Sequence, residues 1–233
     1  MATVTVPGAI LGKRPVGKSP VRSGMPCTVV LRQLLGYSLM RALVIYSHPV
    51  NDSFCAAMRD AAVNGLTRAG HHVDVIDLAA ENFDPVMSRD EWHNYLESHG
   101  KISPSLERHV ALVKAADILV FAYPTWWSGL PAQLKGWLER IMIENVAYRF
   151  TKTNRVRPAL TNVKKIYILS TFGSPHWYIA FIHNNGKRVL SRALRLSTGR
   201  AHVTSHFLYS MDTQRNEHRV EFLKKITDSL AKS

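Results

Sequence analysis

The sequence predicts an α/β domain in which a doubly wound parallel sheet of five strands lies between two layers of helices. Short apolar segments alternate with amphipathic segments from residue 41 to residue 231, as in sheets whose parallel strands are joined by helices. Residues 118–121 (ILVF) are apolar at every position, which is typical of a parallel strand buried on both faces. An apolar series with helical spacing follows them, from Leu130 to Ile141.

Each element is expected where the apolar period changes. The expected strands are 41–47, 72–78, 117–123, 163–171 and 202–209. The expected helices are 53–69, 105–115, about 130–145, one within 178–197, and 213–231, with an irregular segment at 79–104. Gly70 ends the first helix as a C-terminal cap residue does, and Pro124 ends the third strand.

The absence of one motif favours a particular strand order. The sequence has no GxGxxG, which argues against the dinucleotide-binding fingerprint. The remaining common order is the flavodoxin-like one, 2-1-3-4-5, whose ligand lies at the switch between strands 1 and 3. The predicted fold is therefore a flavodoxin-like three-layer α/β/α domain.

Composition limits the function classes. The 233 residues include two cysteines, Cys27 and Cys55, and no CxxC, so we expect no metal site, a reducing compartment and a cytoplasmic location. The net charge is +13, but the basic residues are scattered without a long Lys/Arg run or a nucleic-acid motif. We therefore expect anionic small molecules rather than nucleic acid as partners.

Residues 1–39 are expected to lie outside the domain, which we assign to residues 40–233. They are basic and acid-free, and we interpret them as a disordered extension or an over-long start; a targeting segment is an alternative. Residues 12–19 (GKRPVGKS) match the phosphate-loop pattern, but Pro20 prevents the helix that this loop requires. Residues 27–40 are too short to span a membrane, so no integral membrane segment is expected.

Three loops after strands 1, 3 and 4 are predicted to meet at one edge of the sheet. The first, 47–57, leads into a helix N-terminus that suits a phosphate, with His48 and Ser53 as donors. The alternative is that Ser53 only caps the helix and His48 only packs under the loop. The second loop, 124–129, carries Trp126 and Trp127. These side chains favour a flat ligand; the alternative is that they only cover the core.

The third loop, 170–178, adds Gly173 and a further aromatic wall at Trp177 and Tyr178, whose alternative is ordinary packing at the start of a helix. A phosphate site, an aromatic loop and a loop rich in accessible backbone together suit a flavin. The sequence therefore predicts a flavin-binding edge.

At this point a family resemblance is evident. Residues 41–230 resemble the flavodoxin-like NAD(P)H:quinone oxidoreductases, the family that includes DT-diaphorase and bacterial relatives. The matching segments are HPVNDSFCAAM, DLAAENFDPVMSRDEW, YPTWWSGLPAQLKGWLERI and LSTFG.

The resemblance implies tightly bound FAD or FMN, NAD(P)H as co-substrate, and a homodimer. It implies a pyrophosphate loop at His48, Ser53, Phe54 and Cys55. It implies flavin-ring contacts at Pro124, Thr125, Trp126, Trp127, Ser128, Ser170, Thr171, Phe172 and Gly173. Tyr178 matches the active-site tyrosine, and Tyr148 and Phe150 match aromatics that close the substrate pocket, often from the other subunit.

Three departures from the family pattern qualify these assignments. Cys55 stands where asparagine is usual, and Phe172 replaces a glycine. The family histidine lies six residues after the tyrosine, a position held here by Asn184, so His183 is one residue short. One residue turns a helix by about 100°, so His183 is assigned a catalytic role only if its side chain reaches the flavin.

The predicted function is two-electron, ping-pong transfer of hydride from NAD(P)H through flavin N5 to a quinone-like acceptor. Azo- or nitro-compound reduction is an alternative at the same site. Another is a flavin-binding ancillary subunit of a membrane system of the potassium-efflux type. A flavodoxin-like electron carrier is disfavoured, because such carriers are acidic and this chain is basic.

Overall fold

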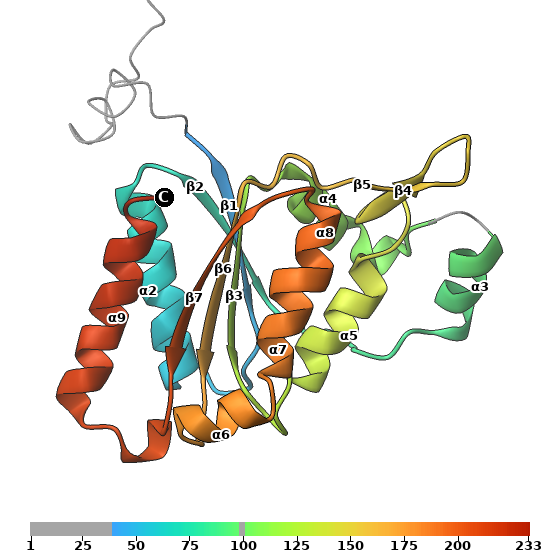
Figure 1. Cartoon of the computed structure of the whole chain (residues 1–233). Coiled ribbons are helices and arrows are strands. Elements are labelled where there is room, and N and C mark those ends of the chain that lie inside the picture. The colour runs from blue at the N-terminus through green and yellow to red at the C-terminus, as the bar shows by residue number, and fades with distance from the viewer. Residues whose placement is uncertain (1–38, 98–100) are drawn as a thin grey trace, which may run out of the picture.

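The central sheet has five parallel strands in the order β2-β1-β3-β6-β7 (Figure 1). The computed structural model describes residues 39–97 and 101–233. Its sheet strands are β1 (Arg41–Tyr46), β2 (His72–Asp77), β3 (Ile118–Pro124), β6 (Lys165–Thr171) and β7 (His202–Leu208). Numbered along the chain within the sheet, this order is 2-1-3-4-5, so the predicted fold is confirmed. The central strand β3 is buried at all seven positions, as its apolar run predicts.

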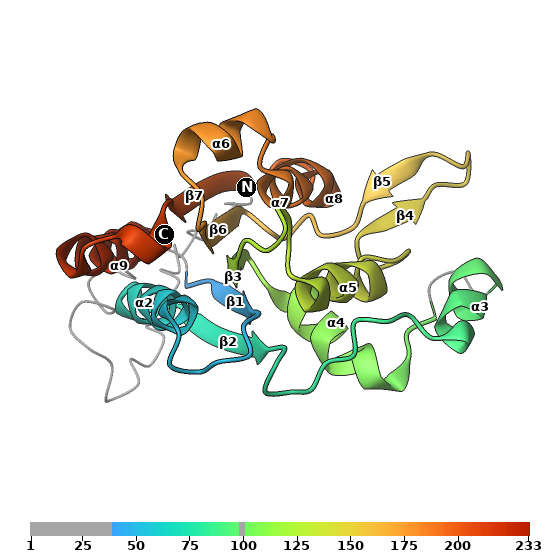
Figure 2. The same ribbon diagram turned by 90° about the horizontal axis from the view of Figure 1, so that it is seen from below.

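Helices cover both faces of the sheet (Figures 1 and 2). One face is covered by α2 (Phe54–Arg68) and α9 (Asn216–Leu230). The other is covered by α4 (Glu107–Ala115), α5 (Ala132–Ile141) and the helical run from α7 (Asn185–Arg188) to α8 (Arg195–Ser197), which buries Leu190 and Leu194. Alternate strand residues point to opposite faces: Leu43 joins the core under α4 and α5, whereas Val44 joins the core under α2 and α9. Helices α2 and α9 pack so closely that a Cβ at Gly65 would lie 2.6 Å from the Thr227 carbonyl oxygen.

The described part of the segment expected to be irregular, residues 79–97 and 101–104, is more ordered than predicted. These residues contain α3 (Arg89–Glu97) and lead into the 3₁₀ turn η1 (Pro104–Leu106). The helix α3 begins with a capping box: Glu91 N donates to Ser88 Oγ at 3.1 Å, and Ser88 N donates to the Glu91 carboxylate at 2.9 Å. The expectation of an irregular segment is therefore wrong for α3.

Helix α5 holds this segment against the domain. The Arg140 guanidinium donates to both carboxylate oxygens of Glu91, at 3.0 and 2.6 Å, and lies 5.0 Å from the ring centroid of Phe83. A Cβ at Gly136 would lie 2.2 Å from the Pro85 carbonyl oxygen, so only glycine allows this approach. The segment 79–97 is thus fixed by polar groups and close contact.

The region after β6 also differs from expectation. The single helix expected within 178–197 is divided into α6 (His176–Phe181), α7 (Asn185–Arg188), a π-helical segment η2 (Val189–Leu194) and α8. The division falls at two successive left-handed residues, His183 (φ 69°) and Asn184 (φ 40°), because an α-helix cannot continue through positive φ. A short 3₁₀ turn, η3 (Met211–Thr213), precedes α9.

An antiparallel hairpin, β4 (Tyr148–Phe150) with β5 (Val156–Pro158), was not predicted. Apart from Leu39, the expectations for residues 1–39 lie outside the described residues. Within the described residues, no helix has the length and apolar character needed to cross a membrane.

Candidate functional site

The three predicted loops lie together beyond the carboxyl ends of β1, β3 and β6, at the lower end of the sheet in Figure 1. Because β1 and β3 pair directly, and β3 pairs with β6, parallel strands bring all three loops to the same edge.

The first loop ends at the N-terminus of α2. Ser53 caps this helix, since its Oγ accepts a hydrogen bond from Ala56 N at 3.2 Å. The first turn has no acidic residue, and its free N–H groups lie at the positive end of the helix dipole. Ser53 therefore acts as a cap here, and the helix end keeps the properties of an anion site.

His48 is held at the entrance of this loop by Val50. Val50 N donates to His48 Nδ1 at 3.0 Å, and the Val50 carbonyl oxygen lies 3.2 Å from the same nitrogen. The shorter contact makes Nδ1 an acceptor, so the proton of the neutral ring is on Nε2. The His48 ring is also 5.8 Å from that of Trp126, which links the first loop to the second.

Phe54 and Cys55 point away from the surface of the loop. Phe54 stacks on Phe222 of α9, with ring centroids 6.2 Å apart. Cys55 is buried in the core beside Thr171, and burial raises the pKa of its thiol to about 12. The Cys55 thiol is therefore unsuited to contact a phosphate, and its predicted role reduces to the backbone.

The second loop is a tight turn closed by two hydrogen bonds between Trp126 and Gly129. The two central residues, Trp127 (φ 46°) and Ser128 (φ 60°), are both left-handed, as in a type I′ turn. This geometry leaves Trp127 fully exposed and Trp126 47% exposed. Neither tryptophan covers the core, so that alternative is wrong.

The base of this loop is joined to the third loop. Pro124 is buried at the end of β3, where it pairs with Thr171. Thr125 N donates to the Thr171 carbonyl oxygen at 2.9 Å, and the hydroxyls of Thr125 and Ser170 lie 2.9 Å apart. This contact fixes the distance between the two loops.

Phe172 turns inward instead of facing the ligand edge. It is buried and stacks on Tyr209, with centroids 5.0 Å apart and an interplanar angle of 18°. The next residues, Gly173 and Ser174, are more accessible, and their amides donate no hydrogen bond within residues 39–97 and 101–233. The phenylalanine at the family's glycine position therefore leaves the neighbouring backbone donors available.

A cavity of about 270 Å³ opens between the second and third loops. Its lining combines backbone, a hydroxyl and aromatic rings: Thr125, Trp127, Ser128, Phe172, Gly173, Ser174, Tyr178 and Ile179. Accessible amides beside a flat aromatic wall are donors that the carbonyl edge of an isoalloxazine can accept. The residues present therefore fit a flavin ring, and the N-terminus of α2 at the same edge fits a phosphate.

The two predicted catalytic residues, Tyr178 and His183, line different cavities. Tyr178 lines the 270 Å³ cavity, as expected for the family tyrosine. His183 lines a different cavity, beside α7, because the left-handed residues after α6 turn the chain. The structure therefore does not bring His183 to Tyr178.

Tyr148 and Phe150 lie on β4, which is remote from the three loops (Figure 1). Their rings meet edge to face at 5.8 Å, and the Tyr148 hydroxyl is 3.3 Å from that of Tyr95. Burial, reinforced by Tyr95 and Glu144, raises the pKa of Tyr148 to about 12. Tyr95 in turn stacks on Trp92, so the structure adds two aromatics that sequence reasoning did not select.

Comparison with known proteins agrees with this fold. A family model described as a flavodoxin-like fold matches residues 40–230. NAD(P)H dehydrogenase (quinone) 1 of Cavia porcellus is 35% identical over 156 residues, which cover 60% of this chain and 56% of that protein. The chain thus matches little more than half the length of this curated relative.

Two solved structures are similar over most of the chain. The structure of Smu.1420 from Streptococcus mutans is 28% identical with a TM-score of 0.74, covering 83% of this chain and all of that one. An NAD(P)H:quinone oxidoreductase from Methanothermobacter marburgensis is 24% identical with a TM-score of 0.73, covering 83% and 98%. The second likeness supports the fold alone.

Proposed function

Because the chain belongs to the family described by the flavodoxin-like fold model, we propose that it is a flavin-dependent NAD(P)H oxidoreductase acting on a quinone-like acceptor. The observation that carries the proposal is the 270 Å³ cavity between the second and third loops, with the anion site of α2 at the same edge. The name of the Cavia porcellus relative supports the choice of reaction.

Residues of different loops bind different parts of the cofactor. The helix end at Ser53 and the Nε2–H of His48 receive phosphate, which either FMN or FAD supplies. The amides of Gly173 and Ser174 receive the polar edge of the ring. When bound, the flavin would supply two-electron hydride chemistry at its N5 atom, between NAD(P)H and the acceptor.

Tyr178 is the residue we assign to charge stabilisation. It lines the cavity from the start of α6, opposite Trp127. Its hydroxyl can donate to a carbonyl oxygen that gains negative charge as the reaction proceeds. His183 is omitted from this role because it faces the other cavity.

A second copy of the chain would complete the substrate pocket. Trp127 is exposed at the cavity, and Phe150 is exposed on the hairpin. We propose that the hairpin of one subunit covers the cavity of the other, which places Phe150 beside the substrate. Phe150→Ala should then raise KM for a quinone and weaken the dimer measured by light scattering. An unchanged KM and mass would refute this arrangement.

The experiment that tests the proposed function uses the full chain. The protein is reconstituted with FMN or FAD, and its visible spectrum is recorded before and after NADH or NADPH, with and without a quinone. Bleaching by the nucleotide and recovery with the quinone are expected. A protein that retains neither flavin would overturn the proposal, and bound flavin with negligible turnover would favour the ancillary-subunit interpretation.

Tyr178→Phe tests the assigned role. Loss of a hydrogen bond to a charged group should lower kcat by about 10- to 100-fold while flavin retention stays the same. Trp177→Phe is the matched control, since Trp177 is adjacent and exposed but does not line the cavity. Equal kcat values for the two variants would remove Tyr178 from the mechanism.

A further inference from the structure

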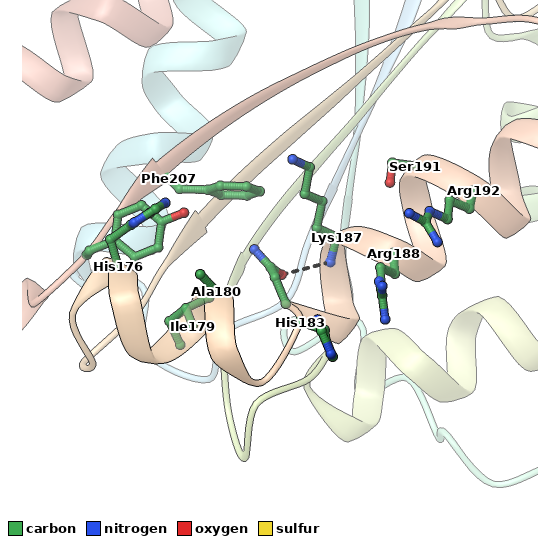
Figure 3. A pocket seen from close by; sticks show the side chains of 11 residues that line it. His176, Ile179, Ala180, His183, Lys187, Arg188, Ser191, Arg192 and Phe207 are labelled. Atoms are coloured by element: carbon green, nitrogen blue, oxygen red, sulfur yellow. Dashed lines mark hydrogen bonds between the residues drawn. The ribbon is translucent and has the colours of Figure 1, made fainter.

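A second cavity, of about 320 Å³, lies on the other side of α6 (Figure 3). One wall is aromatic and comes from Phe207 and Tyr209 of the β7 edge with His176 of α6. The other wall comes from the helix that begins at α7 and carries Lys187, Arg188 and Arg192. A volume of this size, near the lower limit of about 300–1,000 Å³ for small-molecule sites, suits part of a nucleotide rather than a macromolecule.

The geometry of the α6–α7 connection creates this cavity. The left-handed residues His183 and Asn184 separate the two helices, and the Asn184 side chain then accepts a hydrogen bond from Lys187 N at 3.1 Å. The π-helical segment that follows carries Arg192 one turn beyond Arg188, and Figure 3 shows both side chains projecting from this helix. Paired left-handed residues and π-helical segments are both over-represented at functional sites.

The basic wall has no acidic counterpart. No Asp or Glu occurs between Glu144 and Asp212, although this segment contains eleven Lys and Arg residues. In the part of the chain that the structure describes, Lys187, Arg188 and Arg192 form no ion pair, and Lys187 lies 5.7 Å from the Phe207 ring centroid. A cavity with this charge therefore favours a ligand with several phosphate charges.

The two cavities share a side chain. Ile179 of α6 lines both the 270 Å³ cavity beside Tyr178 and the 320 Å³ cavity beside Lys187. The cavities lie on opposite sides of α6, and a helix with its side chains is about 10–12 Å in diameter. A dinucleotide, whose two bases are separated by two riboses and two phosphates, can place one end in each cavity.

We propose that the 320 Å³ cavity binds the phosphorylated adenosine end of NADPH while the nicotinamide end enters the 270 Å³ cavity. This inference rests on the proposed oxidoreductase function. The adenine packs against the aromatic wall of this cavity, and the 2′-phosphate is received by Arg188 and Arg192. In Rossmann-type sites a carboxylate binds the ribose 2′-hydroxyl of NADH, whereas an arginine binds the 2′-phosphate of NADPH, and the same chemistry of charge applies here. The lining contains arginine and no carboxylate, so NADPH is the preferred donor.

Steady-state kinetics of the flavin-loaded protein test this preference. In the Arg188→Gln/Arg192→Gln double variant, the ratio of kcat/KM for NADPH to that for NADH should fall by about tenfold or more. The control is Arg200→Gln, which removes one positive charge from the acid-free segment outside the cavity. A wild type that does not prefer NADPH, or a double variant with an unchanged ratio, would overturn the inference.

A binding measurement separates this inference from the proposed function. Calorimetric titration with adenosine 2′,5′-bisphosphate needs neither flavin nor turnover. Binding to the wild type that weakens about tenfold in the double variant, but not in Arg200→Gln, supports the site even if no oxidoreductase activity is found. Equal affinity of the double variant, or equal affinity of the wild type for adenosine 5′-monophosphate, excludes a 2′-phosphate site even if the enzyme turns over.

Discussion

Residues 40–144 and residues 145–211 use charge in different ways. The first segment contains both signs, and several of its arginines are paired: Arg59 with Asp77, Arg108 with Glu81, and Arg140 with Glu91. The second segment contains no carboxylate side chain. Charges in the first segment therefore stabilise the fold through ion pairs, whereas the described residues of the second segment form none. Experiments that change single charges can test this contrast.

The largest effect is expected at Arg140. Arg140 and Glu91 are each only 10% exposed, so Arg140→Met leaves a buried carboxylate without its partner. We expect a loss of about 3 kcal/mol in the free energy of unfolding, measured by urea denaturation. Lys135→Met is the control, because its exposed pair with Glu139 should contribute less than about 1 kcal/mol. Equal losses would show that the pair at Arg140 has no special role.

A somewhat smaller loss is expected from a change of shape without a change of charge. Gly136→Ala brings a methyl group against the Pro85 backbone, and the repacking should cost about 1–3 kcal/mol. Gly129→Ala serves as the control, since the nearest atom to its Cβ would be 3.9 Å away. If both variants unfold at the same urea concentration, segment 79–97 can move away from α5 without cost.

Acid should act mainly on the first segment. Burial alone would raise the pKa of Glu91, but the hydrogen bonds and charge of Arg140 outweigh it, so the pKa is lowered. A lowered folded pKa stabilises the protein above the unfolded value, and this contribution is lost as pH falls through the folded value. The melting temperature of Glu91→Gln should therefore fall less between neutral and acid pH than that of the wild type. Parallel melting profiles would contradict the assignment.

The smallest effect is expected in the acid-free segment. Arg157→Gln and Arg200→Gln each remove a cation that has only like charges within its own segment. Their free energies of unfolding should lie within about 0.5 kcal/mol of the wild type or slightly above it. Added salt should raise the melting temperature of the wild type more than that of a variant lacking both arginines. A loss of more than about 1 kcal/mol from either change would show that these charges stabilise the fold.

The central part of the fold could be predicted from sequence because its signal is local. The apolar run of β3 indicates a strand that is buried on both faces, and the helical spacing from Leu134 to Ile141 indicates which face of α5 is buried. The capping box at Ser88 and Glu91 was an equally local signal, and it could have revealed α3. The absence of acid from residues 145–211 was also visible in the sequence.

Other features depend on contacts between distant segments. The inward turn of Phe172 follows from its packing on Tyr209, and the position of His183 follows from two left-handed residues with no glycine to announce them. Neither Phe172 nor His183 could be placed from periodicity, because the position of Phe172 depends on long-range packing and that of His183 on positive backbone φ angles. These two residues are also among the three positions at which the chain departs from the family pattern.

The turn at Trp127 and Ser128 has a consequence for how this protein balances stability with function. Asn-Gly is the pair best suited to a type I′ turn, and a chain selected for stability alone would carry it here. Tryptophan and serine in these positions cost about 1–2 kcal/mol each in conformational free energy. This cost is incurred during folding, before a ligand arrives, so the loop does not have to be ordered again at each binding event. A substitution in this turn could therefore increase the stability of the protein while weakening its binding of a ligand.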